Sequence, residues 1–275
     1  VMGIINGTTN YILTQMTEAG QSFEDALADA QKLGYAEANP TADVEGFDAM
    51  YKLSILSSMA FHAHMPIEVI YREGITKLTK ADFETAQLLG YKIKLLAIGK
   101  KNGNRIEVRV HPTMLPATHP LASVRGVFNA IFLTGHAVDD IMLYGRGAGC
   151  MPTASAVVSD IVYACHAEKR HQYMTFQNDE SMSSEIELVK DFSCIYSVRL
   201  RVADLPGTMA AIAGSFAEHG VSLKSVIQLG ETDGKSSRIT FITHRASEFS
   251  VREALKQIEA LSCVEEIESM IRVEE

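Results

Sequence analysis

The sequence predicts an α+β protein of two domains joined by a linker. Residues 1–168 combine helical periodicity with several β-rich runs, which predicts a mixed sheet covered by helices. Residues 193–275 follow the order strand, helix, strand, strand, helix, strand, which predicts a four-stranded sheet with two helices on one face. Between these regions, residues 169–192 are polar and acidic without clear periodicity, so we interpret them as the linker.

The composition argues against several classes of partner. A chain of 275 residues with 47% hydrophobic residues can bury a sizeable core, and its net charge of −9 argues against nucleic acid and anionic membranes. No apolar run reaches transmembrane length, and no signal peptide is visible. His62 and His64 would point to different sides of a helix, so we predict no metal site. Four widely spaced cysteines predict buried free thiols in a reducing cytoplasm: Cys150, Cys165, Cys194 and Cys263.

Residues 1–34 predict two helices. The run from Asn6 to Asn10 reads as a turn and a threonine cap, followed by a helix with Tyr11 and Met16 on one face. Thr8 can be this cap or a ligand contact, and its neighbours in the sequence leave both open. A second helix opens at Ser22 and ends at Gly34.

The stretch from Gly34 to Lys52 gathers carboxylates, a tyrosine and a lysine around one turn. Pro40 disfavours helical backbone at the residue before it, so residues 35–39 should form a loop. Thr41 or Asp43 can cap the next helix, which we expect to run from about residue 44 to 61. Because this helix is apolar on most sides, we expect it to be largely buried.

Asp48 and Lys52 lie four residues apart, so one helix face presents both. Such a pair is usually a solvated surface contact that contributes a few tenths of a kcal/mol. A lysine at the head of a buried helix, however, needs a partner or a function. With Glu37 and Asp43 nearby, the set is suited to acid–base chemistry on an amino-acid-like substrate.

The rest of the first domain predicts a helix over 79–89 and strands over 91–100 and 105–112, joined by a hairpin turn. A second strand pair is expected over 127–135 and 136–144. Lys92, Lys94 and Lys100 are most simply solvated strand positions. Gly147 and Gly149 precede a small-residue helix to about 168, and such glycines can let backbone approach a phosphate. They do not form the dinucleotide fingerprint, so alone they are weak evidence.

The stretch from Gly34 to Lys52 resembles the catalytic signature of homoserine dehydrogenases: G-Y-x-E, a proline, an acidic pair, then G-x-D-x-x-x-K. The run Gly7-Thr8-Thr9-Asn10 is similar to the start of the substrate domain in that family. The resemblance implies that residues 1–168 form a catalytic and dimerisation domain.

The second domain resembles an ACT domain through its D-L-P-G-T loop, Asp204 to Thr208, and the G-V-S-L run from Gly220. The resemblance implies that residues 193–275 are a regulatory domain that binds an amino acid, with effector contacts at Asp204, Leu205, Gly207 and Thr208. Backbone N–H groups at a helix start can hold an α-carboxylate. The alternative is a ferredoxin-like module without a ligand, because fold alone does not give function.

The family resemblance also implies the reaction, a reversible hydride transfer between NAD(P)H and L-aspartate 4-semialdehyde that yields L-homoserine for threonine, methionine and isoleucine synthesis. Lys52 would be the acid and Asp48 would orient it. Glu37 would take the substrate ammonium, and Asp43, Tyr35 and Thr8 would line the pocket. Gly147 and Gly149 would be secondary cofactor contacts.

Homoserine dehydrogenases begin with a Rossmann domain, and no strand, glycine-rich turn and helix of that kind is present here. The chain therefore resembles the C-terminal portion of such an enzyme, and we expect little activity from it alone. The resemblance further implies a homodimer or homotetramer regulated by threonine. The alternative function is a non-catalytic module for amino-acid sensing or dimerisation.

Overall fold

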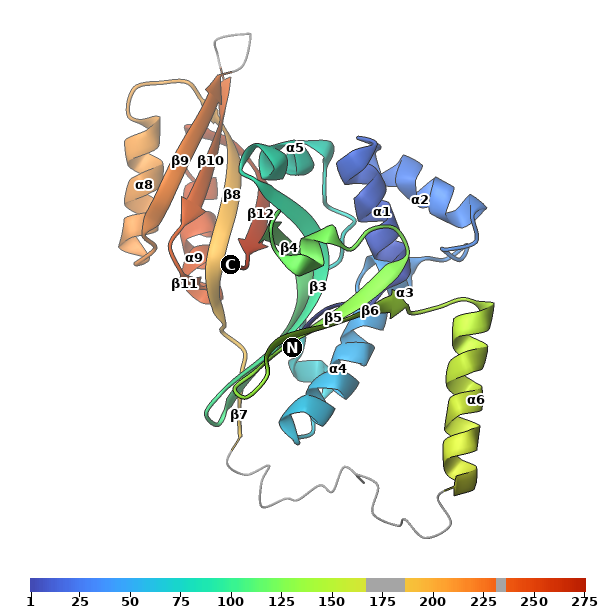
Figure 1. The fold of residues 1–275 in the computed structure, drawn as a ribbon. Helices are drawn as coiled ribbons and strands as arrows, with labels where there is room; N and C mark the ends of the chain where they lie inside the picture. The colour runs from blue at the N-terminus through green and yellow to red at the C-terminus, as the bar shows by residue number, and fades with distance from the viewer. Residues whose placement is uncertain (167–185, 231–235) are drawn as a thin grey trace. The chain divides into compact units, whose positions relative to one another are not determined.

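The computed structural model describes residues 1–166, 186–230 and 236–275, which divide into two compact units (Figure 1). Unit 1 comprises Val1–Pro112 and Ala117–Lys190, and unit 2 comprises Thr113–Pro116 and Asp191–Glu275. Most of the predicted linker, 169–185, lies outside the described residues, and the predicted domain boundaries stay predictions. No helix in the described ranges has the length and apolar character needed to cross a membrane.

Unit 1 contains the mixed sheet that the sequence predicts. Its strands follow the order β6-β5-β1-β3-β4, with β1 antiparallel to both β3 and β5, and with β2 and β7 parallel to β4. Both expected strand pairs are present. The strands are β1 (Met2–Ile4), β2 (Tyr71–Arg72), β3 (Tyr91–Asn102), β4 (Arg105–Pro116), β5 (Phe128–Gly135), β6 (Asp139–Arg146) and β7 (Glu187–Val189).

Three helices of unit 1, α1, α2 and α5, begin at short polar side chains that accept backbone N–H groups. Asn6 caps α1, Ser22 caps α2, and Thr79 with Asp82 forms a capping box at α5. Thr8 is therefore not the cap of the first helix. The helices are α1 (Gly7–Glu18), α2 (Phe23–Lys32), α3 (Thr41–Val44), α4 (Phe47–Phe61), α5 (Lys80–Leu88) and α6 (Cys150–His166), with 3₁₀ turns at Ile67–Val69 and Pro120–Ser123.

The helix expected over 44–61 is interrupted, because Gly46 adopts a left-handed φ of 78°. A glycine accepts this conformation readily, so the chain turns there and separates α3 from α4. Neither Thr41 nor Asp43 caps α4, which starts after Gly46. The expectation of a largely buried helix is also wrong on one face, where Tyr51, Ile55 and Met59 are exposed.

Unit 2 has the predicted strand–helix–strand–strand–helix–strand order. Its antiparallel strands lie in the order β12-β8-β10-β9, and side chains such as Val198, Phe216, Phe241 and Ile258 are buried. Thr113 and Met114, from the end of β4, pair in parallel with β12 inside this unit. The elements are β8 (Ser193–Ala203), α8 (Thr208–Glu218), β9 (Leu223–Gly230), β10 (Ser236–Thr243), β11 (Ala246–Ser247), α9 (Glu248–Glu259) and β12 (Val264–Val273).

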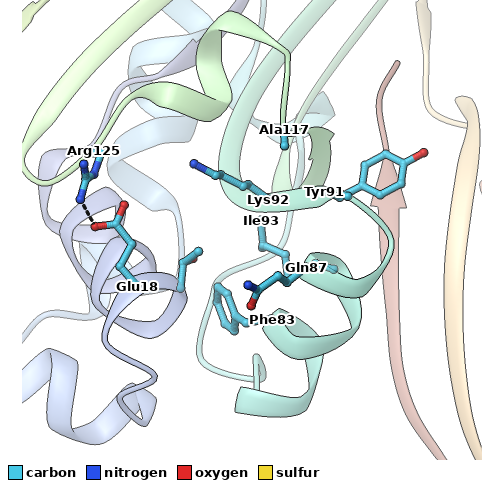
Figure 2. Close-up of a pocket in the computed structure, with 11 residues that line it drawn as sticks. Glu18, Phe83, Gln87, Tyr91, Lys92, Ile93, Ala117 and Arg125 are labelled. Atoms are coloured by element: carbon cyan, nitrogen blue, oxygen red, sulfur yellow. Dashed lines mark hydrogen bonds and ion pairs between the residues drawn. The ribbon is translucent and has the colours of Figure 1, made fainter. Parts of the chain in front are cut away.

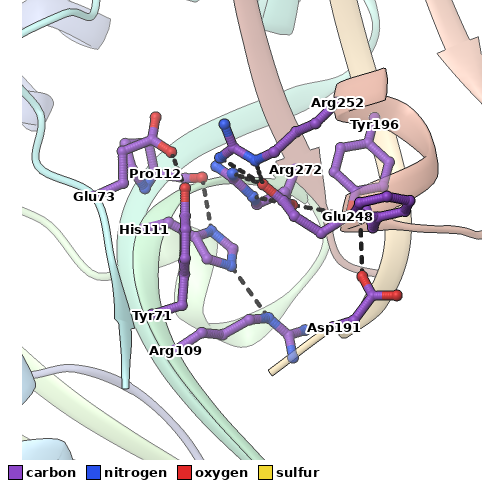
Figure 3. A network of polar contacts seen from close by, with 11 residues as sticks. Tyr71, Glu73, Arg109, His111, Pro112, Asp191, Tyr196, Glu248, Arg252 and Arg272 are labelled. Atoms are coloured by element: carbon purple, nitrogen blue, oxygen red, sulfur yellow. Dashed lines mark hydrogen bonds and ion pairs between the residues drawn. The ribbon is translucent and has the colours of Figure 1, made fainter. Parts of the chain in front are cut away.

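A buried ionic network joins α9 to the sheet of unit 2 (Figure 3). Glu248 is 6% exposed and accepts hydrogen bonds from Arg272 Nε at 3.0 Å, Arg252 Nε at 2.8 Å and the Tyr196 hydroxyl at 3.0 Å. Burial alone would raise the pKa of Glu248, but the hydrogen bonds and charge of Arg272 outweigh it and lower that pKa. Replacing one member would leave a buried charge without its partner. Figure 3 also draws a unit 1 contact, in which Arg109 Nε donates to His111 Nε2 at 3.1 Å.

Two sequence expectations about single residue types are corrected. All four cysteines are free, but of the four only Cys194 is buried, whereas Cys263 is partly exposed and Cys150 and Cys165 are exposed. Lys94 is not a solvated strand residue: it is 4% exposed, and its Nζ donates to Asn10 Oδ1 at 3.1 Å and to the Val124 carbonyl at 2.6 Å. This amine thereby ties α1 to β3. Burial, and secondarily the positive charge of Lys92, lowers the pKa of Lys94 from 10.5 to about 8.

The stability of the wild type relative to Lys94→Met is expected to rise between pH 8 and 10.5. Below this window both the folded and the unfolded chain hold the proton, so the folded state bears the full cost of burying the charge. Within it the unfolded chain keeps the proton and the folded chain has lost it, so the free energy of unfolding increases with pH. The gain over the window is about 3 kcal/mol, which urea unfolding at several pH values can measure.

Lys101→Met is the matched control, because Lys101 is exposed near the end of β3. Its stability difference from the wild type should not change across the window. A Lys94→Met difference that is equally constant with pH would show that the amine is not buried as described.

Candidate active site

Seven of the predicted site residues line one cavity of about 410 Å³ in unit 1. It lies where the β1–α1 turn, the loop after α2, the α3–α4 region and the segment after β6 converge. Asn6, Gly7 and Arg146 also line it. Glu37 is exposed on its loop and is not among the lining residues. The predicted residues that line the cavity are Thr8, Tyr35, Asp43, Asp48, Lys52, Gly147 and Gly149.

Asp48 and Lys52 form an ion pair at the wall of this cavity. Lys52 Nζ lies 2.6 Å from Asp48 Oδ2 and also donates to the Ile5 carbonyl at 3.2 Å. The side chain of Asp48 is 31% exposed and that of Lys52 is 47% exposed. A solvated pair one helical turn apart is normally mobile, but the Ile5 carbonyl gives this amine a second fixed acceptor. The lysine is thus both oriented and accessible to a ligand.

Asn6 contacts both carboxylates, and the sequence analysis did not single it out. Its Nδ2 donates to Asp43 Oδ1 at 2.7 Å and to Asp48 Oδ2 at 2.8 Å, while its Oδ1 accepts from Thr9 N at 2.8 Å. A backbone N–H can only donate, so the amide oxygen must face Thr9 and the NH₂ group must face the carboxylates. The one sequence signal is its place before Gly7-Thr8-Thr9, where an asparagine caps a helix.

Thr8 and Tyr35 connect two parts of the cavity wall. The Thr8 hydroxyl donates to the Tyr35 carbonyl at 2.7 Å, and the Tyr35 ring packs against Tyr11 with centroids 5.1 Å apart. The loop after α2 is therefore held against the start of α1. The Thr8 hydroxyl faces the loop backbone, which gives Thr8 a structural as well as a lining role.

A second cavity of about 410 Å³ adjoins the first and is mostly apolar. It shares Lys52, Asn129, Arg146 and Gly147 with the polar cavity. Asn129 Oδ1 is buried and has no hydrogen-bond partner among the described residues. Apolar walls beside an amine, with one acceptor still unsatisfied, fit a flat amide-bearing ring such as nicotinamide. The walls come from α4, β5 and β6: Ile55, Leu56, Ala130, Ile131, Leu143 and Tyr144.

Gly147 and Gly149 each have a structural reason to be glycine, and the two reasons differ. A Cβ at Gly147 would lie 1.9 Å from Asn129 Nδ2, whereas a Cβ at Gly145 would meet nothing within 4 Å. Gly149 has a φ of 116°, which side-chain-bearing residues rarely adopt. A side chain at position 147 would thus force the Asn129 amide to move, and a side chain at position 149 would strain the backbone.

A third cavity, of about 440 Å³, lies at the other end of α1 and contains none of the predicted site residues (Figure 2). Phe83, Gln87 and Ile93 line it, and Glu18 forms an ion pair with Arg125 at its side. The predicted chemistry therefore belongs to the cavities around Lys52.

The profile of the homoserine dehydrogenase family matches residues 1–162, more than half of the chain. The chain belongs to the homoserine dehydrogenase family. An ACT domain profile matches residues 196–263. Homoserine dehydrogenases are generally NAD(P)-dependent.

Named relatives support the family over the whole chain. A homoserine dehydrogenase of Neisseria gonorrhoeae is 43% identical over 279 residues, which cover 100% of this chain and 64% of the relative. The crystal structure of a homoserine dehydrogenase from Thiobacillus denitrificans superimposes with a TM-score of 0.91 at 41% identity, covering 100% of this chain and 63% of that one. The crystal structure of the S. aureus homoserine dehydrogenase superimposes with a TM-score of 0.74 at 32% identity, covering 99% of this chain and 64% of that one. The chain thus spans about 64% of the length of such relatives.

Three of the predicted effector residues, Asp204, Leu205 and Gly207, lie between β8 and α8 in unit 2, and the fourth, Thr208, is the first residue of α8. Gly207, with a φ of 95°, precedes α8, and the Thr208 hydroxyl donates to the Ala203 carbonyl at 3.1 Å. Leu205 is exposed, and Asp204 Oδ1 lies 3.5 Å from Gln228 Nε2 on β9. Gln228 is a neighbour of this loop that the sequence analysis missed, because strand periodicity does not show which cross-sheet residue faces a loop.

Gly147→Ala is expected to destabilise unit 1 by about 1–3 kcal/mol, because the new methyl group overlaps the Asn129 amide. Adding Asn129→Ala should restore most of that loss, since the Asn129 Cβ lies 3.5 Å from the place that the methyl would occupy, an ordinary contact. Thermal unfolding measures both. Gly145→Ala is the control and should be nearly neutral. Equal effects at Gly145 and Gly147 would contradict the assigned contact.

Proposed function

We propose that this chain is the substrate-handling and proton-transferring part of a homoserine dehydrogenase, which interconverts L-homoserine and L-aspartate 4-semialdehyde with NAD or NADP. The observation that carries the proposal is the Lys52–Asp48 ion pair, fixed on the Ile5 carbonyl at the junction of a polar and an apolar cavity. The family match to residues 1–162 supports it.

Lys52 acts as the general acid in the reductive direction. A bound nicotinamide cofactor would supply a hydride to the aldehyde carbon. Negative charge then develops on the aldehyde oxygen, and Lys52 Nζ donates the proton that converts it to the hydroxyl of homoserine. In the oxidative direction the same amine accepts that proton. Asp48, whose Oδ2 lies 2.6 Å from the amine, holds it in place.

The carboxylates beside Lys52 would accept hydrogen bonds from the substrate ammonium. Asp43 lines the polar cavity together with Thr8 and Tyr35, and it supplies an acceptor near Asp48. On the family resemblance alone we also assign Glu37 to this ammonium, although Glu37 is exposed and does not line the cavity. Asn129, Gly147 and Gly149 would face the nicotinamide end of the cofactor, with Arg146 as the adjacent cation.

Binding of the whole cofactor needs the Rossmann domain of the family, so we expect little or no dehydrogenase activity from residues 1–275 alone. Apolar side chains of α4, β6 and α6 support association with further protein surface, and we propose a homodimer or homotetramer built through unit 1. The exposed side chains include Tyr51, Ile55, Leu143, Tyr144, Val158, Ile161, Val162 and Tyr163. We assign the ACT domain to feedback inhibition by an amino acid, with threonine as the effector.

In a full-length enzyme that contains this chain, Lys52→Ala should lower kcat by about 10²–10⁴-fold, because the proton donor is lost. Its stability should change by less than about 1 kcal/mol, since the ion pair is half-exposed. Steady-state kinetics and thermal unfolding measure the two effects. Lys32→Ala removes another surface lysine, paired with Asp29 at 3.2 Å, and should leave kcat unchanged.

Retained activity in Lys52→Ala would overturn the assignment of the acid. Turnover of homoserine by residues 1–275 alone at a normal enzymatic rate would overturn the need for a separate nucleotide-binding domain. A full-length protein inactive on homoserine would favour the non-catalytic module instead.

Threonine is expected to raise the thermal stability of this chain, because a ligand that binds only the folded state stabilises it by about 2.7 kcal/mol at a hundredfold excess over Kd. Differential scanning fluorimetry with a threonine titration measures the shift. Asp204→Ala should abolish it, and glycine, which lacks the side chain, serves as the ligand control. If no amino acid shifts the transition, the effector assignment fails and unit 2 is a ligand-free module.

A further inference from the structure

The side chain of Asn6 is fully committed inside the polar cavity. The residue is 6% exposed, and its Oδ1 accepts from both the backbone N–H and the hydroxyl of Thr9, at 2.8 and 3.0 Å. Its two N–H bonds go to Asp43 and Asp48. Because every hydrogen-bonding position of the amide is used, the group cannot rotate without breaking several contacts.

The Asn6 amide bridges two carboxylates that belong to different helices. Asp43 lies on α3 and Asp48 on α4, and the left-handed turn at Gly46 separates them. Two carboxylates brought close together repel each other, and a shared donor group offsets part of that repulsion. The amide therefore fixes the distance between Asp43 and Asp48 as well as their orientation.

The same amide selects which oxygen of each carboxylate stays available to a ligand. Asp48 Oδ2 accepts from both Asn6 Nδ2 at 2.8 Å and Lys52 Nζ at 2.6 Å, and Asp43 uses Oδ1. Asp48 Oδ1 and Asp43 Oδ2 have no side-chain hydrogen bond within the part of the chain that the structure describes. One rigid donor thus leaves one oxygen of each carboxylate for the substrate.

Asn6 also shares its turn with the second anchor of the amine. Its neighbour Ile5 provides the carbonyl that accepts from Lys52 Nζ at 3.2 Å. The turn between β1 and α1 consequently contacts the ion pair at both ends, through a main-chain oxygen at Lys52 and a side-chain amide at Asp48.

We propose that Asn6 is a positioning residue of the reaction: its amide bridges Asp43 and Asp48 and, through Asp48, sets the place of the Lys52 amine. The proposal rests on the proposed function for its rate effects. Asn6 has a second role as the N-cap of α1, and the experiment must separate the two.

Asn6→Ser separates them, because serine can still accept the Thr9 N–H as a cap but cannot donate to two carboxylates. In the full-length enzyme we expect kcat to fall by about 10²-fold, the effect typical of a small displacement of a catalytic group. Ser22→Ala is the matched control: it removes the cap of α2 and should lower stability without changing kcat. A kcat loss in Asn6→Ser no larger than in Ser22→Ala would overturn the proposal.

A double-mutant cycle tests whether Asn6 acts through Asp48. If it does, the double variant Asn6→Ser/Asp48→Asn should have a kcat no more than about twofold below that of Asp48→Asn alone. A difference of this size is the usual uncertainty of such a cycle. If the two losses multiply in full, Asn6 acts independently of Asp48 and the proposal is overturned. A role in helix capping alone gives this second result.

The chain itself allows a test that does not depend on activity. In ¹H–¹³C spectra the Cε signal of Lys52 reports the surroundings of its amine, so this signal should shift from its wild-type position in Asn6→Ser. The Ser22→Ala variant should keep the wild-type position. An unchanged Lys52 signal in Asn6→Ser would overturn the proposal even if the enzyme is active. A full-length wild type inactive on homoserine would refute the proposed function, while the spectra still decide the role of Asn6.

Discussion

The pairing of Lys52 with Asp48 depends on a turn that is far from both in the sequence. On α4 alone the pair would be an ordinary surface contact, with little preference for one geometry. The carbonyl of Ile5 and the amide of Asn6 lie more than 40 residues earlier, and they convert this contact into a fixed arrangement. The sheet matters for the same reason, because β1 lies between β3 and β5 and so gives the turn a rigid base.

Local sequence patterns predicted much of the fold because short-range rules governed those elements. The caps at Ser22 and Thr79, the hairpin between β3 and β4, and the alternating elements of unit 2 each follow from a few neighbouring residues. The break at Gly46 was missed, because a single glycine in a helical pattern can be tolerated or can turn the chain. Tertiary packing, not the sequence pattern, determines which outcome occurs.

The candidate site was predictable where a motif carried it and not where contacts between distant segments did. The motif from Gly34 to Lys52 predicted four residues that line the cavity and one, Glu37, that does not; the four are Tyr35, Asp43, Asp48 and Lys52. Asn6 and Asn129 have no sequence pattern that marks them. Only the folded chain shows that the Asn6 amide bridges two carboxylates and that the Asn129 amide packs against Gly147. Lys94 was misread for a related reason, since strand alternation does not reveal that α1 covers that face.

The partial exposure of the ion pair has an electrostatic consequence. In contact with water, two unit charges about 4 Å apart attract by about 1 kcal/mol, whereas in a partly protein-like environment the figure is about 4 kcal/mol. The apolar side chains beside Lys52 border an open cavity, where Ile55, Leu143 and Tyr144 are more than half exposed. A ligand that displaces water from that space lowers the local dielectric constant and strengthens the electrostatic attraction between Asp48 and the Lys52 amine. The strength of this ion pair therefore depends on what occupies the cavity.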